Sequence, residues 1–188
     1  MTAVRVAVLA SGGGTNLQAL LDALTGSPLA RMARVITNRP DAGAVDRARR
    51  AGVPTTVLRD PNDPAELLSA LGDAQLVVLA GYLKLIPAPV VARFRGRMIN
   101  IHPALLPDFG GPGMYGHHVH EAVLASGAQE SGVTIHFVDE AFDRGAIIAQ
   151  ERVPVAPGDT PETLAARVLE AEHRLLPKVV LELAQRIR

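Results

Sequence analysis

The sequence predicts an α/β fold in which one open, twisted and mostly parallel sheet carries helices on both faces. Short apolar runs rich in β-branched residues alternate with stretches of helical apolar periodicity. The first run, Val4–Ala10, passes through a glycine-rich turn into a helical pattern, and Gln75–Ala80 is apolar at nearly every position, as a central parallel strand should be. We expect a single domain over residues 1–188, with a Rossmann-like half over about residues 1–95 and a second half over about residues 96–188.

The composition limits the classes of protein to which this chain can belong. With 188 residues, of which 48% are hydrophobic, the chain can bury one sizeable core. Lys plus Arg and Asp plus Glu number 19 each, so no net charge attracts nucleic acid or a membrane, and we expect small-molecule partners and a monomer or homodimer. The absence of cysteine excludes disulfides, thiol nucleophiles and thiolate metal sites. Because no signal-like apolar stretch precedes the first strand, we expect a cytoplasmic protein.

The turn Ser11–Asn16 joins the first strand to a helix whose apolar positions are Leu17, Leu20, Leu21 and Leu24. Glycines let backbone N–H groups approach an anion closely, and a helix N-terminus adds partial positive charge, so we interpret the turn as a phosphate site. It is not the dinucleotide fingerprint, whose third glycine would fall at Leu17, and no Gly-Lys-Ser or Gly-Lys-Thr completes a Walker loop. The alternative is a tight turn without a ligand.

The rest of the first half continues the alternation of strands and helices. Strands are expected at Ala33–Thr37 and Thr55–Leu58, and helices through 44–51, 67–71 and 88–94. Leu83, Leu85 and Ile86 follow the central strand, at the end of a parallel sheet where ligands bind. They either form the wall of a flat ligand's site or pack beneath the next helix.

Two polar side chains stand out in the apolar strand that begins at Met98. Asn100 and His102 are two residues apart, so on a strand they point to the same face, and Pro103 ends the ladder immediately afterwards. An amide beside an imidazole suits a reaction in which negative charge develops on a carbonyl oxygen. The alternative is a hydrogen-bonded structural histidine.

A long loop rich in glycine and proline, Leu105–Gly116, follows this strand and is expected to act as a flap on the substrate side. His117, His118 and His120 then open a helix. Three close histidines suggest a metal, but their spacing at a helix start does not complete a ligand set, so we expect no metal.

The last third of the chain predicts two more strands and a long helix. Gly132–Val138 and Ala146–Val155 are the strand segments, and Pro161–Arg186 is a long amphipathic helix that packs across the sheet. Between the strands lies the acidic loop Asp139–Gly145. One of its carboxylates is positioned to reach His102, although a solvated turn is the alternative.

Three segments resemble one known family along nearly the whole chain and in the same order. They are Ser11-Gly-Gly-Gly-Thr-Asn-Leu17, Asn100-Ile-His-Pro-Ala-Leu-Leu-Pro107, and Gly132-Val-Thr-Ile-His-Phe-Val138 with Asp143-Arg-Gly145. Together they resemble the folate-dependent phosphoribosylglycinamide formyltransferases of purine synthesis. The resemblance implies transfer of a formyl group from 10-formyltetrahydrofolate, as co-substrate, to the amine of 5'-phosphoribosylglycinamide, without a metal.

The resemblance also implies which residues form the site. The catalytic residues would be Asn100, His102 and Asp143, with His136 close behind them. Arg144 is a mild departure, because the family usually has Asp-Gly-Gly or Asp-x-Gly at this place. The ribonucleotide would be held by Gly14, Thr15, Asn16 and Glu172, and the folate would be surrounded by Leu83, Lys84, Leu85, Ile86, Asp139, Glu140, Ala141 and Phe142.

As a mechanism, we expect protonated His102 and the Asn100 amide to stabilise the oxyanion of a tetrahedral intermediate. Asp143 would orient His102 and aid movement of the amine proton. Three alternatives remain at this point: formyl transfer to another acceptor, hydrolysis of the formyl folate, and a non-catalytic nucleotide-binding module.

Overall fold

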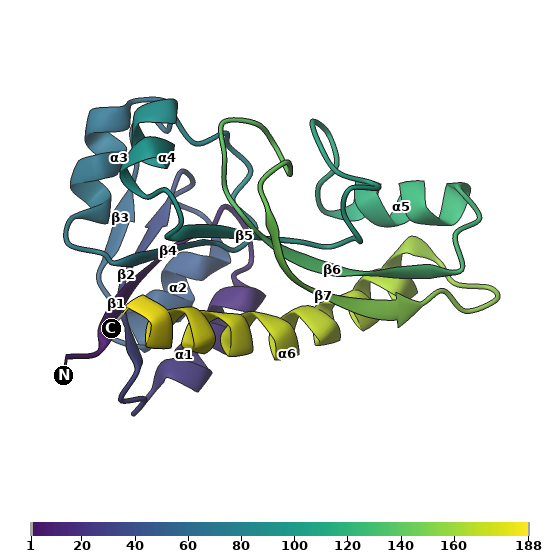
Figure 1. Cartoon of the computed structure of the whole chain (residues 1–188), viewed down its shortest axis with the longest axis horizontal. Coiled ribbons are helices and arrows are strands. Elements are labelled where there is room, and N and C mark those ends of the chain that lie inside the picture. Colours follow the sequence, from purple (N-terminus) through teal and green to yellow (C-terminus); the bar gives the residue numbers. More distant parts are fainter. Residues whose placement is uncertain (1, 188) are drawn as a thin grey trace.

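The computed structural model describes residues 2–187 and contains one seven-stranded sheet with helices on both faces (Figure 1). The strands lie in the order β3-β2-β1-β4-β5-β6-β7. The strands are β1 Val4–Leu9, β2 Ala30–Thr37, β3 Thr55–Val57, β4 Leu76–Leu79, β5 Met98–His102, β6 Glu130–Phe137 and β7 Ile147–Pro154. The helices are α1 Thr15–Leu24, α2 Gly43–Arg50, α3 Pro64–Leu71, α4 Ala88–Arg93, α5 His117–Ala125 and α6 Pro161–Ile187.

The sheet changes character at β5. Strands β1 to β5 pair in parallel, whereas β5 pairs with β6, and β6 with β7, in antiparallel fashion. This arrangement confirms the expected open and mostly parallel sheet. The parallel part comprises β1 to β5, so it extends past residue 95 into the second half of the chain, and β6 and β7 add the antiparallel part.

Alternation along the central strands divides the core between the two faces of the sheet. Val6 and Val8 of β1 pack with the buried residues of α1, α2 and α6, whereas Ala7 and Leu9 pack with those of α3 and α4. Both faces of β1 are therefore apolar, which explains why the strand is a continuous apolar run rather than an alternating one.

The structure shifts several expected strand boundaries. β2 begins at Ala30, earlier than the expected Ala33, because Ala30 pairs with Val4 at the start of β1. β6 begins at Glu130, earlier than the expected Gly132, because Glu130 pairs with Pro154 at the end of β7. β7 runs from Ile147 to Pro154, one residue shorter at each end than the expected strand. Pairing with a neighbour, which local periodicity does not report, sets these limits.

The long helix α6 runs beneath the sheet along its length (Figure 1). Its buried stripe includes Leu164, Val168, Leu176 and Val180, and one acidic residue, Glu172, lies in the same stripe. The expected packing across the sheet is confirmed. Within residues 2–187, no helix combines the length and the apolar character needed to cross a membrane.

Gly132 of β6 lies close to both β7 and the turn after β5. A Cβ at this position would overlap the backbone carbonyl oxygen of Glu151 and would lie 2.6 Å from Leu105 Cδ2. Gly132→Ala should therefore separate β6 from β7 and lower the free energy of unfolding by about 1–3 kcal/mol. Denaturant unfolding monitored by circular dichroism measures this change. Unchanged stability would show that the two strands shift apart without penalty.

Candidate functional site

A cavity of about 540 Å³ opens at the carboxyl ends of β4 and β5. Its walls come from the segment after β4, from β5, from the loop before α5, from the loop between β6 and β7, and from α1 and α6. Polar groups converge at Asn100, His102, His136 and Asp143, and a second polar pair, Asn16 and Glu172, also borders the cavity. Cavities of this kind, largely apolar with a few convergent polar groups, are typical ligand sites.

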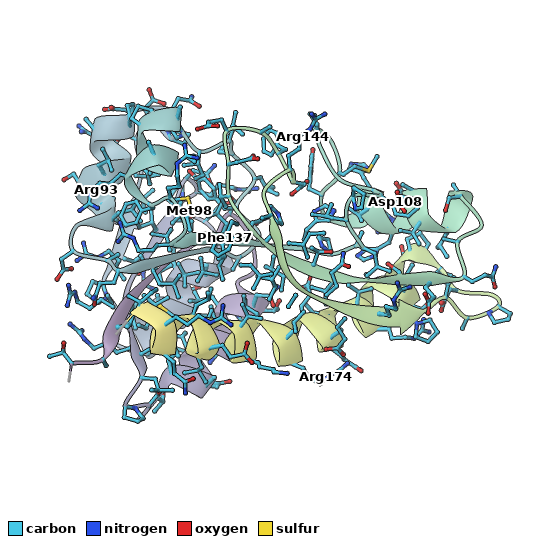
Figure 2. All side chains as sticks on the ribbon, in the orientation of Figure 1. Arg93, Met98, Asp108, Phe137, Arg144 and Arg174 are labelled. Atoms are coloured by element: carbon cyan, nitrogen blue, oxygen red, sulfur yellow. The ribbon has the colours of Figure 1, made fainter. Side chains whose placement is uncertain are left out.

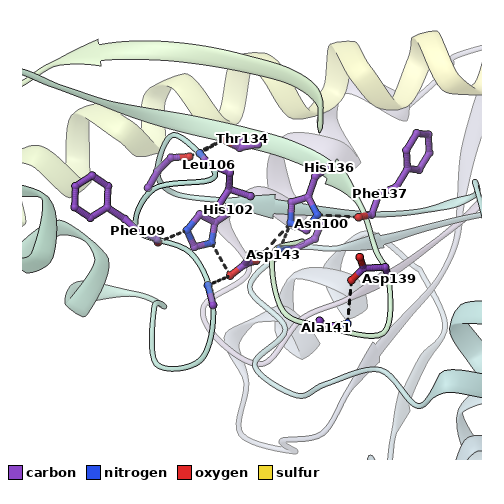
Figure 3. A network of polar contacts seen from close by, with 12 residues as sticks. Asn100, His102, Leu106, Phe109, Thr134, His136, Phe137, Asp139, Ala141 and Asp143 are labelled. Carbon is purple, nitrogen blue, oxygen red and sulfur yellow. Dashed lines mark hydrogen bonds and ion pairs between the residues drawn. The ribbon is translucent and has the colours of Figure 1, made fainter. Parts of the chain in front are cut away.

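Asn100 and His102 point to one face of β5 and both line the cavity, as the sequence predicts. The Asn100 Nδ2 atom lies 3.3 Å from Asp143 Oδ1 and 3.1 Å from His136 Nε2 (Figure 3). These contacts join β5 to β6 and to the loop that follows β6. The acidic loop therefore does reach the Asn-His pair, and the interpretation of this loop as a solvated turn is wrong for Asp143.

His102 lies between a carboxylate and a backbone carbonyl. Its Nε2 atom is 2.8 Å from the carbonyl oxygen of Phe109, and its Nδ1 atom is 3.5 Å from Asp143 Oδ2 (Figure 3). Because a carbonyl only accepts, Nε2 must carry a proton in this arrangement. The imidazole is 3% exposed, so both of its nitrogens depend on protein partners.

Asp143 connects three parts of the site. Besides its contacts with Asn100 and His102, it lies 3.4 Å from His136 Nε2 and accepts a hydrogen bond of 2.9 Å from the Gly111 N–H. Its backbone has a φ of 57°, which is unusual for a residue with a side chain. Such a conformation persists only when surrounding contacts fix it, and these four partners do so.

Burial and neighbouring charges set the protonation of the pair. Burial lowers the pKa of His102 below 6.5, and the Asp143 charge opposes this shift only in part. For Asp143, burial acts to raise the pKa, but His136, His102 and the Gly111 N–H outweigh it and hold the pKa below 3.8. Near neutral pH an ionised carboxylate therefore faces an imidazole whose neutral form is favoured.

The glycine two residues after Asp143 is required by packing. A Cβ on Gly145 would overlap the carbonyl oxygen of Phe137, at the end of β6. Arg144, between Asp143 and Gly145, is exposed, and Figure 2 shows it at the outer end of the loop that joins β6 and β7.

Sequence reasoning missed the residues that hold the turn after His102. The Thr134 hydroxyl donates to the Ala104 carbonyl at 2.6 Å and accepts from the Leu106 N–H at 3.0 Å. Gln150 Nε2 donates to the same hydroxyl and to the Leu106 carbonyl, both at 2.9 Å. The turn leads to Phe109, so these residues support the carbonyl that contacts His102. Only the register of β5, β6 and β7 places Thr134 and Gln150 beside this turn, and a single sequence does not reveal that register.

The apolar wall of the cavity contains exposed side chains from two loops. Leu83 and Leu85 are 46% and 45% exposed, and Phe142 is 38% exposed. Ile86 is buried, so it both lines the cavity and packs in the core. Large exposed apolar side chains around a cavity are typical of a binding surface, which favours a ligand wall over simple packing beneath the next helix. The other expected folate contacts that line the cavity are Lys84, Asp139 and Ala141.

Glu140 is the one expected folate residue in this loop that does not line the cavity. Its carboxylate forms an ion pair of 3.2 Å with Arg95 instead. Asp139, Ala141 and Phe142 line the cavity, so within this loop the expected folate contacts differ from the structure only at Glu140.

The second polar pair lies between α1 and α6. Asn16 Nδ2 donates to Glu172 Oε2 at 2.7 Å, and both residues line the cavity. Burial raises the pKa of Glu172, and the hydrogen bond from Asn16 opposes that shift. Gly14 precedes α1 with a φ of 74° and provides no side-chain cap, which leaves the first N–H groups of the helix available. Neither Gly14 nor Thr15 itself borders the cavity.

The three histidines that begin α5 contact carboxylates or are buried. His117 contacts Glu121 at 3.2 Å and Glu162 at 3.6 Å, His118 contacts Glu121 at 3.3 Å, and His120 is buried. Among residues 2–187, no group of three or more histidine or carboxylate side chains is arranged to hold a metal ion.

Comparison with known proteins adds to this geometry. Residues 4–180 match the model of the family described as Formyl transferase. The chain belongs to the formyl transferase family. It is 48% identical over 186 residues to the chloroplastic phosphoribosylglycinamide formyltransferase of Arabidopsis thaliana, covering 94% of this chain and 64% of that protein. The chain therefore spans somewhat less than two thirds of the length of that relative.

Other members of the family are similar in length and in structure. The phosphoribosylglycinamide formyltransferase of Haemophilus influenzae is 40% identical, with 94% of this chain and 85% of that protein covered. The crystal structure of the enzyme from Anaplasma phagocytophilum superposes with a TM-score of 0.90 at 38% identity, covering 97% of this chain and 87% of that one. The formyl transferase fold is thus shared over nearly the whole chain.

The protonation of His102 in this formyl transferase can be measured directly. NMR titration should give an imidazole pKa below 6.5, and Asp143→Asn should lower it further by removing the charge that favours the imidazolium. Since the unfolded chain binds this proton near pH 6.5 and the folded chain does not, stability should fall as the pH drops below about 6.5. Titration in urea provides the unfolded reference. A folded pKa above that reference would contradict the dominance of burial.

Proposed function

We propose that this protein transfers the formyl group of 10-formyltetrahydrofolate to the amine of 5'-phosphoribosylglycinamide, giving formyl-phosphoribosylglycinamide and tetrahydrofolate in purine biosynthesis. The observation that carries the proposal is the meeting of Asn100, His102 and Asp143 in a cavity that also has an apolar wall and a separate polar pair. Such a cavity suits two different ligands that react where they meet. The names of the relatives support the choice of acceptor.

The cavity offers a distinct environment for each ligand. The flat pterin of the folate would lie against Leu83, Leu85 and Phe142, which are exposed and apolar. The ribonucleotide phosphate would bind the N–H groups of the glycine loop at Gly14, Thr15 and Asn16, and the ribose hydroxyls would bind Glu172. The chain would form one domain. Its half over about residues 1–95 would supply the phosphate-binding part of the site, and its half over about residues 96–188 would supply the catalytic and folate-binding part.

The chemistry requires three events. The amine nitrogen attacks the formyl carbon, the carbonyl oxygen gains negative charge in a tetrahedral intermediate, and the bond from carbon to the folate nitrogen breaks. His102 and the Asn100 amide would donate hydrogen bonds to that oxygen, the amide by giving up its 3.3 Å contact with Asp143 Oδ1. The amine nitrogen loses a proton and the folate nitrogen gains one. Asp143 would carry this proton, directly or through water, and would orient His102.

The charge of His102 changes during this proposed reaction. The expectation that protonated His102 stabilises the oxyanion concerns the intermediate; in the free protein, burial favours the neutral imidazole. A negative oxygen forming beside the ring raises its pKa, because an opposite charge stabilises the imidazolium. Asp143, 3.5 Å from Nδ1, stabilises the same form. We therefore assign the neutral imidazole, with its proton on Nε2, to the free protein. In the intermediate, Nδ1 would hold the amine proton delivered through Asp143 until that proton returns through Asp143 to the leaving folate nitrogen, so His102 would be an imidazolium only between these two transfers.

The carbonyl of Phe109 occupies the position that the substrate oxygen would need. It lies 2.8 Å from the Nε2 of His102, so formyl binding must replace one acceptor by another. Phe109 has a φ of 54° and is followed by Gly110 and Gly111, which allows the backbone to change direction there. The loop Leu105–Gly116 would move as substrate binds, consistent with its expected role as a flap.

The first test is the reaction itself. Release of folate from 10-formyltetrahydrofolate, measured by absorbance, should require both 5'-phosphoribosylglycinamide and an intact site. Asn100→Ala and His102→Ala should each lower kcat by about 10²–10³. The double variant should lose much less than the product of the two effects, because the groups act on one oxygen. Arg144→Gly serves as the control and should retain activity.

Each other outcome would indicate a different function for this protein. Folate release without the ribonucleotide indicates a hydrolase, and release with another amine indicates a different acceptor. Ribonucleotide binding without any release indicates a non-catalytic module and contradicts the proposal. The cytoplasmic location and the monomer or homodimer state stay predictions, and two plant relatives are chloroplastic.

The phosphate end makes a prediction of its own at Gly13. A Cβ at Gly13 meets no atom within 4 Å, so a side chain fits there. Gly13→Asp should raise the KM for the ribonucleotide about tenfold or more by charge repulsion, with the KM for the folate unchanged. Gly13→Asn has nearly the same shape without the charge and should change the KM far less. Equal effects of the two variants would argue against a phosphate at this loop.

A further inference from the structure

The N-terminal part of α2 lies directly on the glycine loop between β1 and α1. The Ala44 N–H donates to the Gly12 carbonyl at 3.2 Å, and a Cβ on Gly14 would lie 2.8 Å from Ala44 Cα. A Cβ on Gly43 would lie 3.0 Å from the Gly13 carbonyl oxygen. The loop and the helix therefore contact each other backbone to backbone, with no space for a side chain at Gly14 or at Gly43.

Arg47, one turn further along α2, binds the same loop through its side chain. Its Nε donates to the Gly13 carbonyl at 2.7 Å, and its Nη1 lies 3.3 Å from Gln18 Oε1 on α1. The guanidinium is partly buried. Within residues 2–187 it has no carboxylate within ion-pair distance, whereas Arg49 on the same helix pairs with Asp46. A cation without a carboxylate partner is thus fixed beside the glycine loop.

These contacts orient the peptide groups of the loop. In a trans peptide the carbonyl and the N–H of the next residue point in opposite directions. Since the Gly12 and Gly13 carbonyls both point to α2, the N–H groups of Gly13 and Gly14 point away from it. Neither N–H donates to a protein acceptor within the described chain. The bond from Arg47 therefore sets the direction of the Gly14 N–H.

We propose that Arg47 is a positioning residue of the phosphate site: it holds the Gly13–Gly14 peptide with its N–H toward the phosphate and provides the charge that balances it. This inference rests on the proposed function, because it takes the ribonucleotide phosphate as the ligand of the loop. Arg47 does not border the cavity, so it acts through the backbone and through its electric field. The nearby His173 is consistent with that field, because burial and the Arg47 charge both lower its pKa.

A purely structural role for Arg47 predicts a different result from a role in phosphate binding. A structural strut would affect stability and all ligands alike. A phosphate-positioning residue would affect only ligands that carry the phosphate. The ratio of kcat/KM for the ribonucleotide to that for the ribonucleoside without phosphate separates the two roles, because the two substrates differ in nothing else.

The experiment compares Arg47→Met, Arg47→Lys and the control Arg50→Met, an exposed arginine on the same helix. Arg47→Met should reduce the ratio about tenfold or more by raising the KM for the ribonucleotide, with kcat at saturation and the KM for the folate unchanged. Arg47→Lys, which keeps charge and a donor, should recover part of the ratio. Arg50→Met should match wild type.

Binding of ribose 5-phosphate, measured by calorimetry, provides a readout independent of formyl transfer. Wild type should bind it and Arg47→Met should bind it about tenfold or more weakly. Unchanged binding, or an unchanged substrate ratio, overturns the role of Arg47 while formyl transfer stands. Absence of formyl transfer with normal Arg47-dependent phosphate binding instead overturns the proposed function alone.

Discussion

The antiparallel pairing of β5 with β6 is the interaction on which the site depends. Its register places His136 opposite Asn100 and Thr134 opposite His102. Because directly opposed side chains on one face of a sheet lie close together, each polar residue of β5 has a polar neighbour on β6. A shift of one residue would place Ile135 opposite Asn100 or opposite His102, depending on its direction, and would turn the polar side chains of β6 to the other face of the sheet.

Burial makes this register matter energetically. His102 and His136 are almost completely buried, and a buried polar group without a partner destabilises the fold by about 1–3 kcal/mol. The Phe109 carbonyl accepts from His102 Nε2, the Phe137 carbonyl lies 2.8 Å from His136 Nδ1, and the Asn100 amide donates to His136 Nε2. Asp143, 3.5 Å from His102 Nδ1, stabilises the imidazolium form of that ring by its charge. Phe109 and Asp143 both have positive φ values, so the two loops hold strained backbone at the site. In the free protein the buried polar groups of the site therefore have protein partners. In the proposed reaction the substrate oxygen would replace one of these partners, the Phe109 carbonyl.

The parallel half of the sheet determines where a second ligand would bind relative to this cluster. β1, β4 and β5 are neighbours and parallel, so the glycine loop after β1, the apolar segment after β4 and the polar end of β5 all emerge at one edge. α6 crosses beneath that edge and brings Glu172 to Asn16. In the proposed reaction this arrangement would fix the distance between the phosphate and the reacting amine through the rigid sheet, with the flap as the mobile part.

Local sequence determined the elements and their polar ends. The apolar runs, the glycine loop and the spacing of Asn100 and His102 specify strands, a helix start and a shared face, because period and backbone sterics act over a few residues. Only tertiary structure decided the register between strands, and with it the contacts of Thr134 and Gln150. It also decided the contact of the Phe109 carbonyl with His102, the lowered pKa of that histidine and the hydrogen bond of Arg47 to the glycine loop. Strand pairing, backbone carbonyl direction and burial join residues far apart in the chain, and local periodicity contains no information about them.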